Sequence, residues 1–327
     1  MTNDLPLRSG SSGEAVRDVQ RRLTSLGYDT GDDEQGSYGG ATERAVLGFQ
    51  ERRGLRADGI CGQQTWTSLV EAGYRLGDRL LYLAAPMLRG DDVGELQQDL
   101  GALGFDAGRV DGIFGPRTRD ALEQFQRNTA ITVDGVCGPD TVAALRRVVR
   151  GTDAGPTVAV LREVEAMREA PHQLESRRFC VGETGGLGAL ADAIGRALAN
   201  AGAVVAVLHH PDESVQAEEA NAFGAEAYLG IAVREDPGCA TYFYAAAAFE
   251  SIGGRRLAEL ALEVLTAQPF MATGECAGMR MPILRETRMP AVLCELGPAQ
   301  IVVEHTGELA RTLTLAFSRW VESPVDR

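Results

Sequence analysis

The sequence predicts a multidomain protein: two small all-α domains of three helices each, followed by an α/β domain with a largely parallel sheet covered by helices. Three observations predict it. The first half repeats itself, so that Phe49-Gln50 recurs as Phe125-Gln126. Apolar residues in that half recur three or four positions apart, as in amphipathic helices. From Arg177 onward, short apolar runs alternate with helical patterns, which is typical of a covered parallel sheet.

The two repeats are predicted to occupy residues 5–73 and 84–150. A motif shared across most of two neighbouring segments indicates a duplicated structural unit. The aligned stretches are Leu7-Arg-Ser-Gly with Leu88-Arg-Gly-Asp, Leu26-Gly-Tyr with Leu103-Gly-Phe, and Asp58-Gly-Ile-Cys-Gly with Asp134-Gly-Val-Cys-Gly.

Each repeat is expected to form three short helices. In the first copy, an apolar stripe from Val16 to Leu26 predicts the first helix, and Gly27 follows as its terminating glycine. Thr42 and its counterpart Thr118 are the expected N-caps of the second helix. An Asp-Gly turn then separates the second helix from the third.

Residues 151–176 are predicted to be a linker that contains one amphipathic helix over residues 157–170, and it serves as a docking helix or a semi-rigid spacer. The α/β domain is predicted over residues 177–323. Its expected strands are 179–181, 203–208, 227–233, 239–246, 282–284 and 291–294, and its expected helices are 187–201, 215–223, 249–267 and 305–321.

Composition argues against several kinds of partner and location. A net charge of −14 makes nucleic acid and anionic membrane surfaces poor partners. No apolar run is long enough for a transmembrane helix. The N-terminal stretch has neither the basic nor the apolar region of a signal peptide. The six cysteines form no Cys-x-x-Cys pair and fit free, buried thiols. We therefore expect a cytoplasmic protein.

Both repeats resemble the peptidoglycan-binding domain type 1. The second copy carries Val110-Asp-Gly-Ile-Phe-Gly115, whereas the first has Gln35-Gly-Ser-Tyr-Gly-Gly40 at that place. The resemblance implies muropeptide binding, and the alternative is a pair of protein-interaction modules, because the matched positions are mainly turn glycines and core residues. The candidate binding residues are Asp58, Gly59, Gly62, Asp111, Gly112, Phe114, Gly115, Thr118, Asp134, Gly135 and Gly138.

The run from Ile283 to Gly297 resembles the signature of the zinc-dependent N-acetylmuramoyl-L-alanine amidases of type 3. Under this resemblance Glu295 stands at the general-base position and Glu183 is the plausible metal-binding glutamate. The family's first zinc histidine has no counterpart, and Ala232 stands where the second should be. A catalytic zinc needs three ligands and an open position. The resemblance therefore implies a pseudo-amidase without a cofactor, and the alternative is an active zinc amidase that cleaves between MurNAc and L-Ala.

Two other hypotheses concern the start of the α/β domain. His209 and His210 follow the second expected strand, where adjacent side chains point to opposite sides, so at most one could join Glu183 and Glu295 in a relocated zinc site. The run Gly182–Gly188 resembles a Rossmann turn and could hold a nucleotide. All 32 basic residues are arginine, however, so the Tyr-x-x-x-Lys of the related dehydrogenases cannot occur.

The order of the domains resembles the CwlM-type family of actinobacterial proteins, a match that the run Tyr74-Arg-Leu-Gly-Asp-Arg-Leu-Leu-Tyr strengthens. This resemblance implies a cytoplasmic regulator of peptidoglycan precursor synthesis. Its expected ligands are peptidoglycan fragments or a lipid-linked precursor, and its expected protein partner is a peptidoglycan-biosynthetic enzyme.

Overall fold

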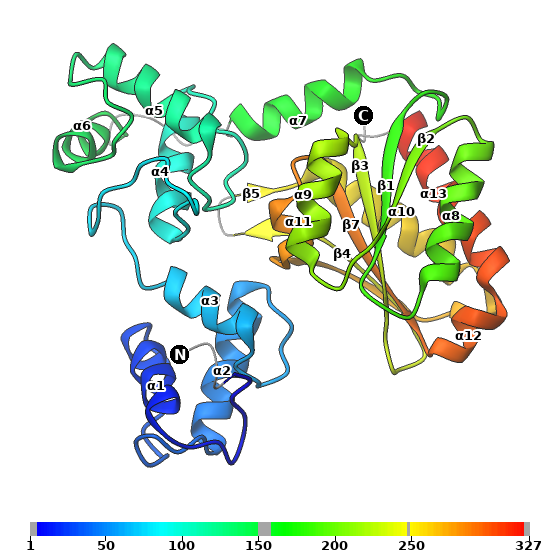
Figure 1. Cartoon of the computed structure of the whole chain (residues 1–327), viewed down its shortest axis with the longest axis horizontal. Helices are drawn as coiled ribbons and strands as arrows, with labels where there is room; N and C mark the ends of the chain where they lie inside the picture. The colour runs from blue at the N-terminus through cyan, green and yellow to red at the C-terminus, as the bar shows by residue number, and fades with distance from the viewer. Residues whose placement is uncertain (1–4, 150–157, 247–248, 324–327) are drawn as a thin grey trace. The chain divides into compact units, whose positions relative to one another are not determined.

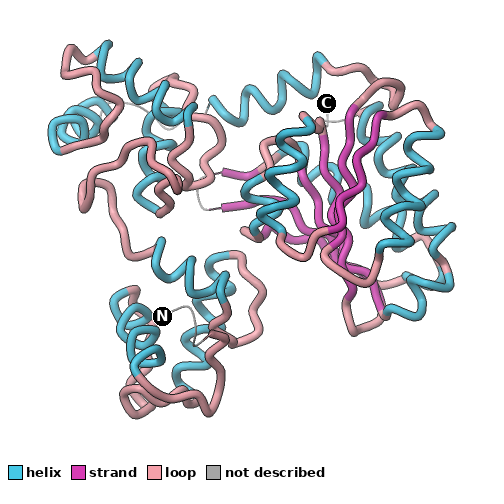
Figure 2. Tube along the Cα trace, in the orientation of Figure 1, coloured by secondary structure: helices cyan, strands magenta, loops and turns pink. Residues whose placement is uncertain are grey.

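The chain folds into two compact units, Met1–Ala159 and Val160–Arg327 (Figures 1 and 2). The computed structural model describes residues 5–149, 158–246 and 249–323. Within these ranges no helix has the length and apolar character that crossing a membrane requires. The predicted beginning of the linker, up to residue 157, lies outside the described residues.

The first unit contains the two predicted three-helix repeats, which confirms this part of the fold class. The helices are α1 (Glu14–Ser25), α2 (Gly40–Arg53) and α3 (Gln63–Glu71) in the first repeat, and α4 (Asp91–Ala102), α5 (Pro116–Asn128) and α6 (Pro139–Val149) in the second. Each repeat buries its own apolar stripe, with Phe49 in the core of the first and Phe125 in the core of the second. Gly27 and Gly104 adopt φ values of 87° and 90° just after α1 and α4, as expected of terminating glycines.

The second helix of each repeat begins earlier than predicted. The N-caps of α2 and α5 are Gly39 and Gly115, so the N-cap prediction for Thr42 and Thr118 was wrong. Both threonines lie buried inside the first helical turn. Their hydroxyls are not free to cap because each accepts a hydrogen bond from a buried glutamine side chain.

The second repeat also begins further upstream than predicted. Leu7 forms an isolated antiparallel bridge with Cys61, and Leu81, rather than Leu88, forms the same bridge with Cys137. Leu81 stands ten residues before the start of α4 (91 − 81), whereas Leu7 stands seven before α1 (14 − 7). A three-residue insertion therefore misled the alignment, and Leu81 belongs to the second core.

The second unit is a helix followed by a seven-stranded mixed sheet with helices on both faces. Its elements are α7 (Val158–Glu169), β1 (Arg178–Glu183), α8 (Gly188–Asn200), β2 (Val204–His209), α9 (Glu213–Phe223), β3 (Ala227–Val233), β4 (Gly238–Ala246), β5 (Phe249–Glu250), α10 (Ile252–Thr266), a 3-10 turn (Pro269–Met271), β6 (Gly274–Met279), α11 (Pro282–Glu286), β7 (Ala291–Gly297), α12 (Ala299–Glu304) and α13 (Thr306–Glu322). The strand order is β2-β1-β3-β7-β4-β5, and β6 also pairs with β4.

The sheet is largely parallel, as predicted, because β2, β1, β3 and β7 all run in one direction. Strand β4 runs antiparallel to β7. The register places Val181, Leu229 and Val292 side by side on one face, where they join the main core with α8, α10 and α13. The opposite face carries Tyr228 and Ala291 in register, and α9 and α11 lie in front of it in Figure 1.

Two local predictions in this unit were wrong, and two elements were missed. Residues 282–284 begin helix α11 rather than a strand, and Pro282 suits the first turn of a helix, where its missing amide costs nothing. The predicted helix over 249–267 starts only at Ile252, because Phe249–Glu250 forms β5 and the Ser251 hydroxyl accepts the Gly254 amide as an N-cap. Strand β6 and helix α12 were not predicted.

The linker helix α7 is docked on the α/β unit. The Glu163 carboxylate accepts hydrogen bonds from the Ser251 hydroxyl at 2.7 Å and the Gly253 amide at 2.8 Å. Met167 is part of the main core. Of the two predicted roles, α7 therefore takes the docking one.

Candidate functional site

Four buried glutamines organise the loops of the two repeats. In the clearest case, Gln126 accepts hydrogen bonds from the amides of Asp134 at 3.1 Å and Gly135 at 3.0 Å. Its Nε2 donates to Asp134 Oδ1 at 2.8 Å, to the carbonyl of Val136 at 3.0 Å and to the Thr141 hydroxyl at 3.3 Å. We call this arrangement a glutamine clamp. The same clamp recurs at Gln20, Gln50 and Gln97, which donate to Thr42, Thr65 and Thr118.

Most of the predicted peptidoglycan-binding residues serve these clamps or the cores. Asp58, Asp111 and Asp134 each accept a clamp hydrogen bond through Oδ1. The turn glycines Gly59, Gly112 and Gly135 have φ values of 71°, 71° and 66°, which other residues rarely adopt. Phe114 lies in the core of the second repeat, Thr118 is buried, and Gly62, Gly115 and Gly138 stand at the starts of α3, α5 and α6. Ligand contact through these residues stays a prediction.

The clamp of the first repeat works without the aspartate that the second repeat has. Gln35 replaces Asp111, and Gln20 Nε2 donates instead to the carbonyl of Glu34 at 3.3 Å. It keeps the bond to the carbonyl of Ser37 at 3.0 Å, as Gln97 does to the carbonyl of Ile113. The Gln20 oxygen accepts the amide of Gly36 at 2.8 Å. The departure from the family pattern therefore changes the surface of the loop and keeps its internal support.

Asp33, which the sequence analysis did not single out, supplies a cap for α2 from outside the helix. Its carboxylate accepts the amides of Gly39 at 3.1 Å, Ala41 at 3.2 Å and Thr42 at 2.6 Å. Burial alone would raise the pKa of Asp33, but the hydrogen bonds from Thr42, Ala41 and Gly39 outweigh it and lower that pKa. An acidic residue shortly before a helix was the sequence signal for this cap.

In the α/β unit, the Glu183 carboxylate is held by its own loop and by His209. It accepts the amides of Gly185 at 2.8 Å and Leu187 at 3.2 Å, and its Oε1 lies 3.1 Å from His209 Nδ1. His209 Nε2 lies 3.3 Å from Asp192 Oδ1. The bond to Glu183 raises the pKa of His209, and Asp192 adds to this shift against the effect of burial. Both ring nitrogens of His209 thus face carboxylates.

The amides of the glycine-rich loop after β1 already donate hydrogen bonds to a carboxylate of the protein, that of Glu183. The amides at positions 185 and 187 point to Glu183, where a Rossmann turn would present amides to a phosphate. Gly185 and Gly186 have φ values of 145° and 85°, so the loop needs its glycines for conformation. This arrangement gives no support to the nucleotide hypothesis.

Glu295 lies within β7 rather than at its end, because the strand continues to Gly297. It is 6% exposed. Glu183 lies beside Ile231, and Ile231 lies beside Cys294. Neighbouring residues of a strand face opposite sides, so Glu295 and Glu183 belong to opposite faces of the sheet.

The structure therefore does not bring together the residues of the hypothetical relocated zinc site. Ala232, in register with Glu295, offers only a methyl group where the family has a zinc ligand. His210 Nδ1 accepts the amide of Asp212 at 3.0 Å and so serves its own loop. Among residues 5–149, 158–246 and 249–323, no group of three or more His, Cys, Asp or Glu side chains is placed to hold a metal ion. The donor set does not fit a catalytic zinc.

A tyrosine and a glutamine fill the space beside the end of β1 on the Glu295 face. The Tyr228 hydroxyl donates to Gln216 Oε1 at 2.7 Å, and Gln216 Nε2 donates to the carbonyl of Glu183 at 2.9 Å. A Cβ added to Gly182 would lie 2.0 Å from both Gln216 Oε1 and the Tyr228 oxygen. Side chains thus occupy this part of the strand end.

The amidase-like signature is also tied to α9. Asn221 donates from Nδ2 to the carbonyl of Glu286 at 2.8 Å, and its Oδ1 accepts the amide of Arg288 at 2.8 Å. These bonds fix the loop between α11 and β7. Asn221 therefore supports the fold of the signature.

Comparisons with known proteins agree with this organisation. Residues 12–69 and 89–145 match the putative peptidoglycan binding domain. The chain is 32% identical to N-acetylmuramoyl-L-alanine amidase CwlM of Mycobacterium tuberculosis, over 89% of this chain and 81% of that protein. It is 32% identical to the amidase CwlL of Bacillus licheniformis, over 37% of this chain and 39% of that protein.

One solved structure with similarity to this chain is the N-acetylmuramoyl-L-alanine amidase from Clostridium difficile 630, with 15% identity and a TM-score of 0.39, covering 46% of this chain and 99% of that chain. The family assignment rests on the sequence match, which extends over most of both chains. With its two helical repeats and its amidase-like α/β unit, the chain belongs to the CwlM-type family of N-acetylmuramoyl-L-alanine amidase proteins.

Proposed function

We propose that this chain is a peptidoglycan-binding pseudo-amidase, a non-catalytic regulator of peptidoglycan metabolism that acts in the cytoplasm. Its ligands are peptidoglycan fragments or a lipid-linked precursor, and its partner is a peptidoglycan-biosynthetic enzyme. The match of both repeats to the putative peptidoglycan binding domain supports the ligand class. The six free cysteines support the cytoplasmic assignment, because a reducing compartment keeps thiols unpaired.

The observation that carries the non-catalytic part is the separation of the two retained carboxylates. Glu183 and Glu295 belong to opposite faces of the sheet, and Ala232 replaces a metal-binding side chain beside Glu295. Amide hydrolysis at neutral pH needs an activated water and a polarised carbonyl, which a zinc with an open position supplies. Two separated carboxylates supply neither. Glu183 instead fixes the loop before α8.

The second candidate is an active zinc-dependent amidase that cleaves the bond between MurNAc and L-Ala. It is favoured by the name of the Mycobacterium tuberculosis relative and by the retained Glu295. Zinc would be its cofactor, and the described side chains offer it no three-ligand site.

Incubation of the purified full chain with soluble muropeptides, with and without added zinc, separates the two candidates. We expect no release of stem peptide in either condition and measurable muropeptide binding in both. Release that depends on zinc and disappears in Glu295→Ala would contradict the pseudo-amidase. Fractionation of cells tests the location, and recovery of the protein only from wall fractions would contradict the cytoplasmic regulator.

A further inference from the structure

Strand β2 forms one border of the sheet, and its outer edge is open (Figure 1). Of the strands in the described part of the chain, only β1 pairs with it. Its sequence, Val204-Val-Ala-Val-Leu-His209, contains no acidic residue, arginine, proline or glycine. None of its six residues is buried, whereas all seven residues of β7, inside the sheet, are buried. An uncharged edge strand of this kind is a template for pairing with another strand.

The backbone groups of alternate residues in β2 point away from the sheet. The amide of Val204 donates to the carbonyl of Arg177 at 2.8 Å and therefore points toward β1. Because successive residues of a strand direct their N–H and C=O groups to opposite sides, those of Val205 and Val207 point outward. Within residues 5–149, 158–246 and 249–323, no backbone or side-chain group forms a hydrogen bond with these outward groups.

The opposite border of the sheet differs from β2 in its residues. Strand β6 lies there, beside β4, and it begins with Gly274 and Glu275, both of them exposed. An exposed charge on an edge strand opposes pairing with a further strand, and glycine weakens the strand itself. Strand β2 has neither feature, so the two borders of one sheet differ in their capacity to add a strand.

A second copy of the chain fits the open edge because β2 is complementary to itself. In an antiparallel pair with a two-fold axis at Ala206, Val205 lies opposite Val207 of the partner subunit. Both residues direct their backbone groups outward, so they exchange two N–H···O bonds, and the two-fold axis repeats the exchange. Val204 lies opposite Leu208 of the partner subunit, so apolar side chains meet and no two charges are opposed.

We propose that β2 is a dimerisation edge, which pairs antiparallel with β2 of a second copy and joins two sheets into one. The self-complementary order of outward groups and apolar side chains selects a second copy over a strand of another protein. A dimer carries four helical repeats instead of two, so a polymeric ligand would be held at more points at once. The pairing itself does not depend on the proposed peptidoglycan binding.

Analytical ultracentrifugation of the full chain over a range of concentrations tests the proposal. We expect the mass to double between about 1 and 100 µM. Added salt should strengthen the dimer, because each copy has a net charge of −14 and salt screens the repulsion between them. Hydrogen exchange of the β2 amides should slow over the same concentration range, since pairing protects the outward amides of Val205 and Val207.

Two substitutions in β2 should weaken the dimer. Val205→Pro removes an outward amide hydrogen from each copy, and proline is tolerated at an edge position whose N–H faces solvent. Two hydrogen bonds are lost per dimer, so the dissociation constant should rise at least about tenfold. Val204→Lys places a charge on the edge at a side chain that is 44% exposed, and should act in the same direction.

The matched control is Leu315→Lys on α13, which adds the same charge at a residue that is 45% exposed and distant in sequence from β2. We expect it to change the dissociation constant less than about twofold. Unaltered thermal unfolding of Val204→Lys establishes that the charged edge is folded. A wild-type chain that stays monomeric at about 100 µM overturns the proposal, whether the edge is then open or occupied by a strand of another protein. A dimer that both β2 variants form as tightly as wild type uses another surface and overturns it too.

Discussion

The two helical repeats have the same interior and different surfaces. Each contains two glutamine clamps, and each closes its core with an aromatic residue, Tyr38 in the first and Phe114 in the second. The Tyr38 hydroxyl also donates to the carbonyl of Gly59 at 2.7 Å, which phenylalanine cannot do. The core of the first repeat thus has a hydrogen bond that the core of the second repeat lacks.

Outside the clamps the repeats diverge. The first has a charged cleft between α1 and the loop over residues 29–35, whereas the second exposes Leu80, Tyr82 and Met87. A Cβ on Gly138 would lie 3.4 Å from Leu80, and one on Gly115 would lie 3.9 Å from Met87, so these apolar side chains flank the glycines of the second motif. The difference teaches that the family motif specifies the scaffold, while residues outside the motif set the chemistry of each repeat's surface.

Removal of a clamp should have the largest effect on this shared interior. We expect Gln97→Ala to lower the free energy of unfolding of its repeat by about 3 kcal/mol, because several buried amides and carbonyls lose their partner. Gln20→Ala should cost about 2 kcal/mol, since its oxygen holds one amide, that of Gly36, where Gln97 holds two. Hydrogen exchange resolved by repeat measures both, and a larger loss for Gln20→Ala would contradict the ranking.

The second-largest effect should come from replacing the N-cap glycine of the second helix by alanine, which should destabilise the first repeat more than the second. In Gly39→Ala the new Cβ would lie 2.4 Å from Asp33 Oδ1, so the aspartate must leave its cap, at a cost of about 1–2 kcal/mol. Gly115→Ala has no heavy atom closer than Met87 Sδ at 3.9 Å and should cost less than about 1 kcal/mol. Thermal unfolding of the two variants measures both costs. Equal decreases in Tm would contradict the claim that the Asp33 cap makes the first repeat more sensitive.

Loss of the Asp33 carboxylate should act mainly through pH. Since the pKa of Asp33 is lowered on folding, the stability it contributes is present above the ordinary value of 3.8 and is lost as pH falls through the lowered folded-state pKa. Asp33→Asn should cost about 1 kcal/mol at neutral pH and make the first repeat less sensitive to acid. The second repeat begins α5 with Pro116, which has no amide hydrogen, and is the internal control. Acid titrations followed by hydrogen exchange test this, and an unchanged acid midpoint would contradict it.

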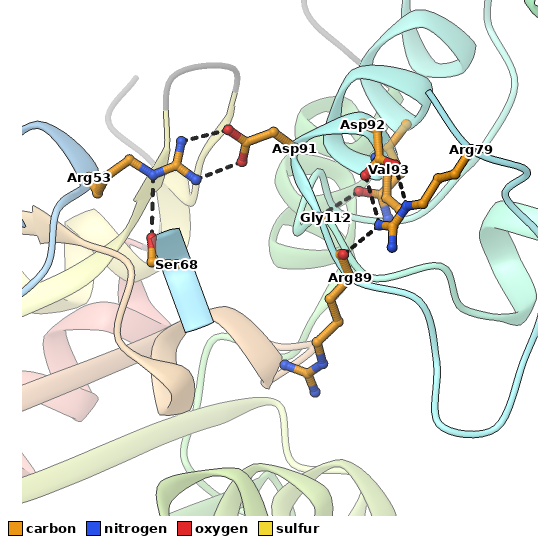
Figure 3. Close-up of polar contacts among 9 residues, drawn as sticks. Arg53, Ser68, Arg79, Arg89, Asp91, Asp92, Val93 and Gly112 are labelled. Carbon is orange, nitrogen blue, oxygen red and sulfur yellow. Dashed lines mark hydrogen bonds and ion pairs between the residues drawn. The ribbon is translucent and has the colours of Figure 1, made fainter. Parts of the chain in front are cut away.

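The smallest effect should come from the ion pair between α2 and α4. Figure 3 shows the fork of Arg53 on Asp91, with nitrogen–oxygen distances of 2.7 and 2.6 Å, and Arg53 Nε donates to the Ser68 hydroxyl at 3.4 Å. The two side chains are 17% and 35% exposed, so we expect a coupling energy of about 0.5 kcal/mol that salt reduces. A double-mutant cycle with Arg53→Ala and Asp91→Ala measures it, and the exposed pair Arg119–Asp120 is the control.

The sequence was sufficient for most of the fold, because the helices of the repeats and the buried strands have clear periods. It was insufficient where the residues of a segment favour neither a strand nor a helix. Strand β6, Gly-Glu-Cys-Ala-Gly-Met, contains no β-branched or aromatic residue, and its strand state comes from pairing with β4. The short run from Pro282 fits a strand or a helical turn equally well until α9 packs against it.

The candidate sites were harder to predict for a different reason. The opposite facing of Glu183 and Glu295 depends on the register across three strands, which motif spacing does not encode. Arg17 and Arg21 lie on the polar side of α1 and are indistinguishable in sequence from an ordinary solvated helix face. Only the fold of the loop over residues 29–35 turns that face of α1 into one side of a cleft.

The buried free cysteines can report the local opening of each domain. Burial raises the pKa of Cys61 and Cys137 to about 12, and burial raises the pKa of Cys294 as well. Thiolate chemistry is therefore suppressed at all three while their surroundings stay closed. Cys61 lies in the first repeat, Cys137 in the second and Cys294 in the sheet. Alkylation at each site, followed by mass spectrometry, would time the opening of the three domains separately in one unmodified chain.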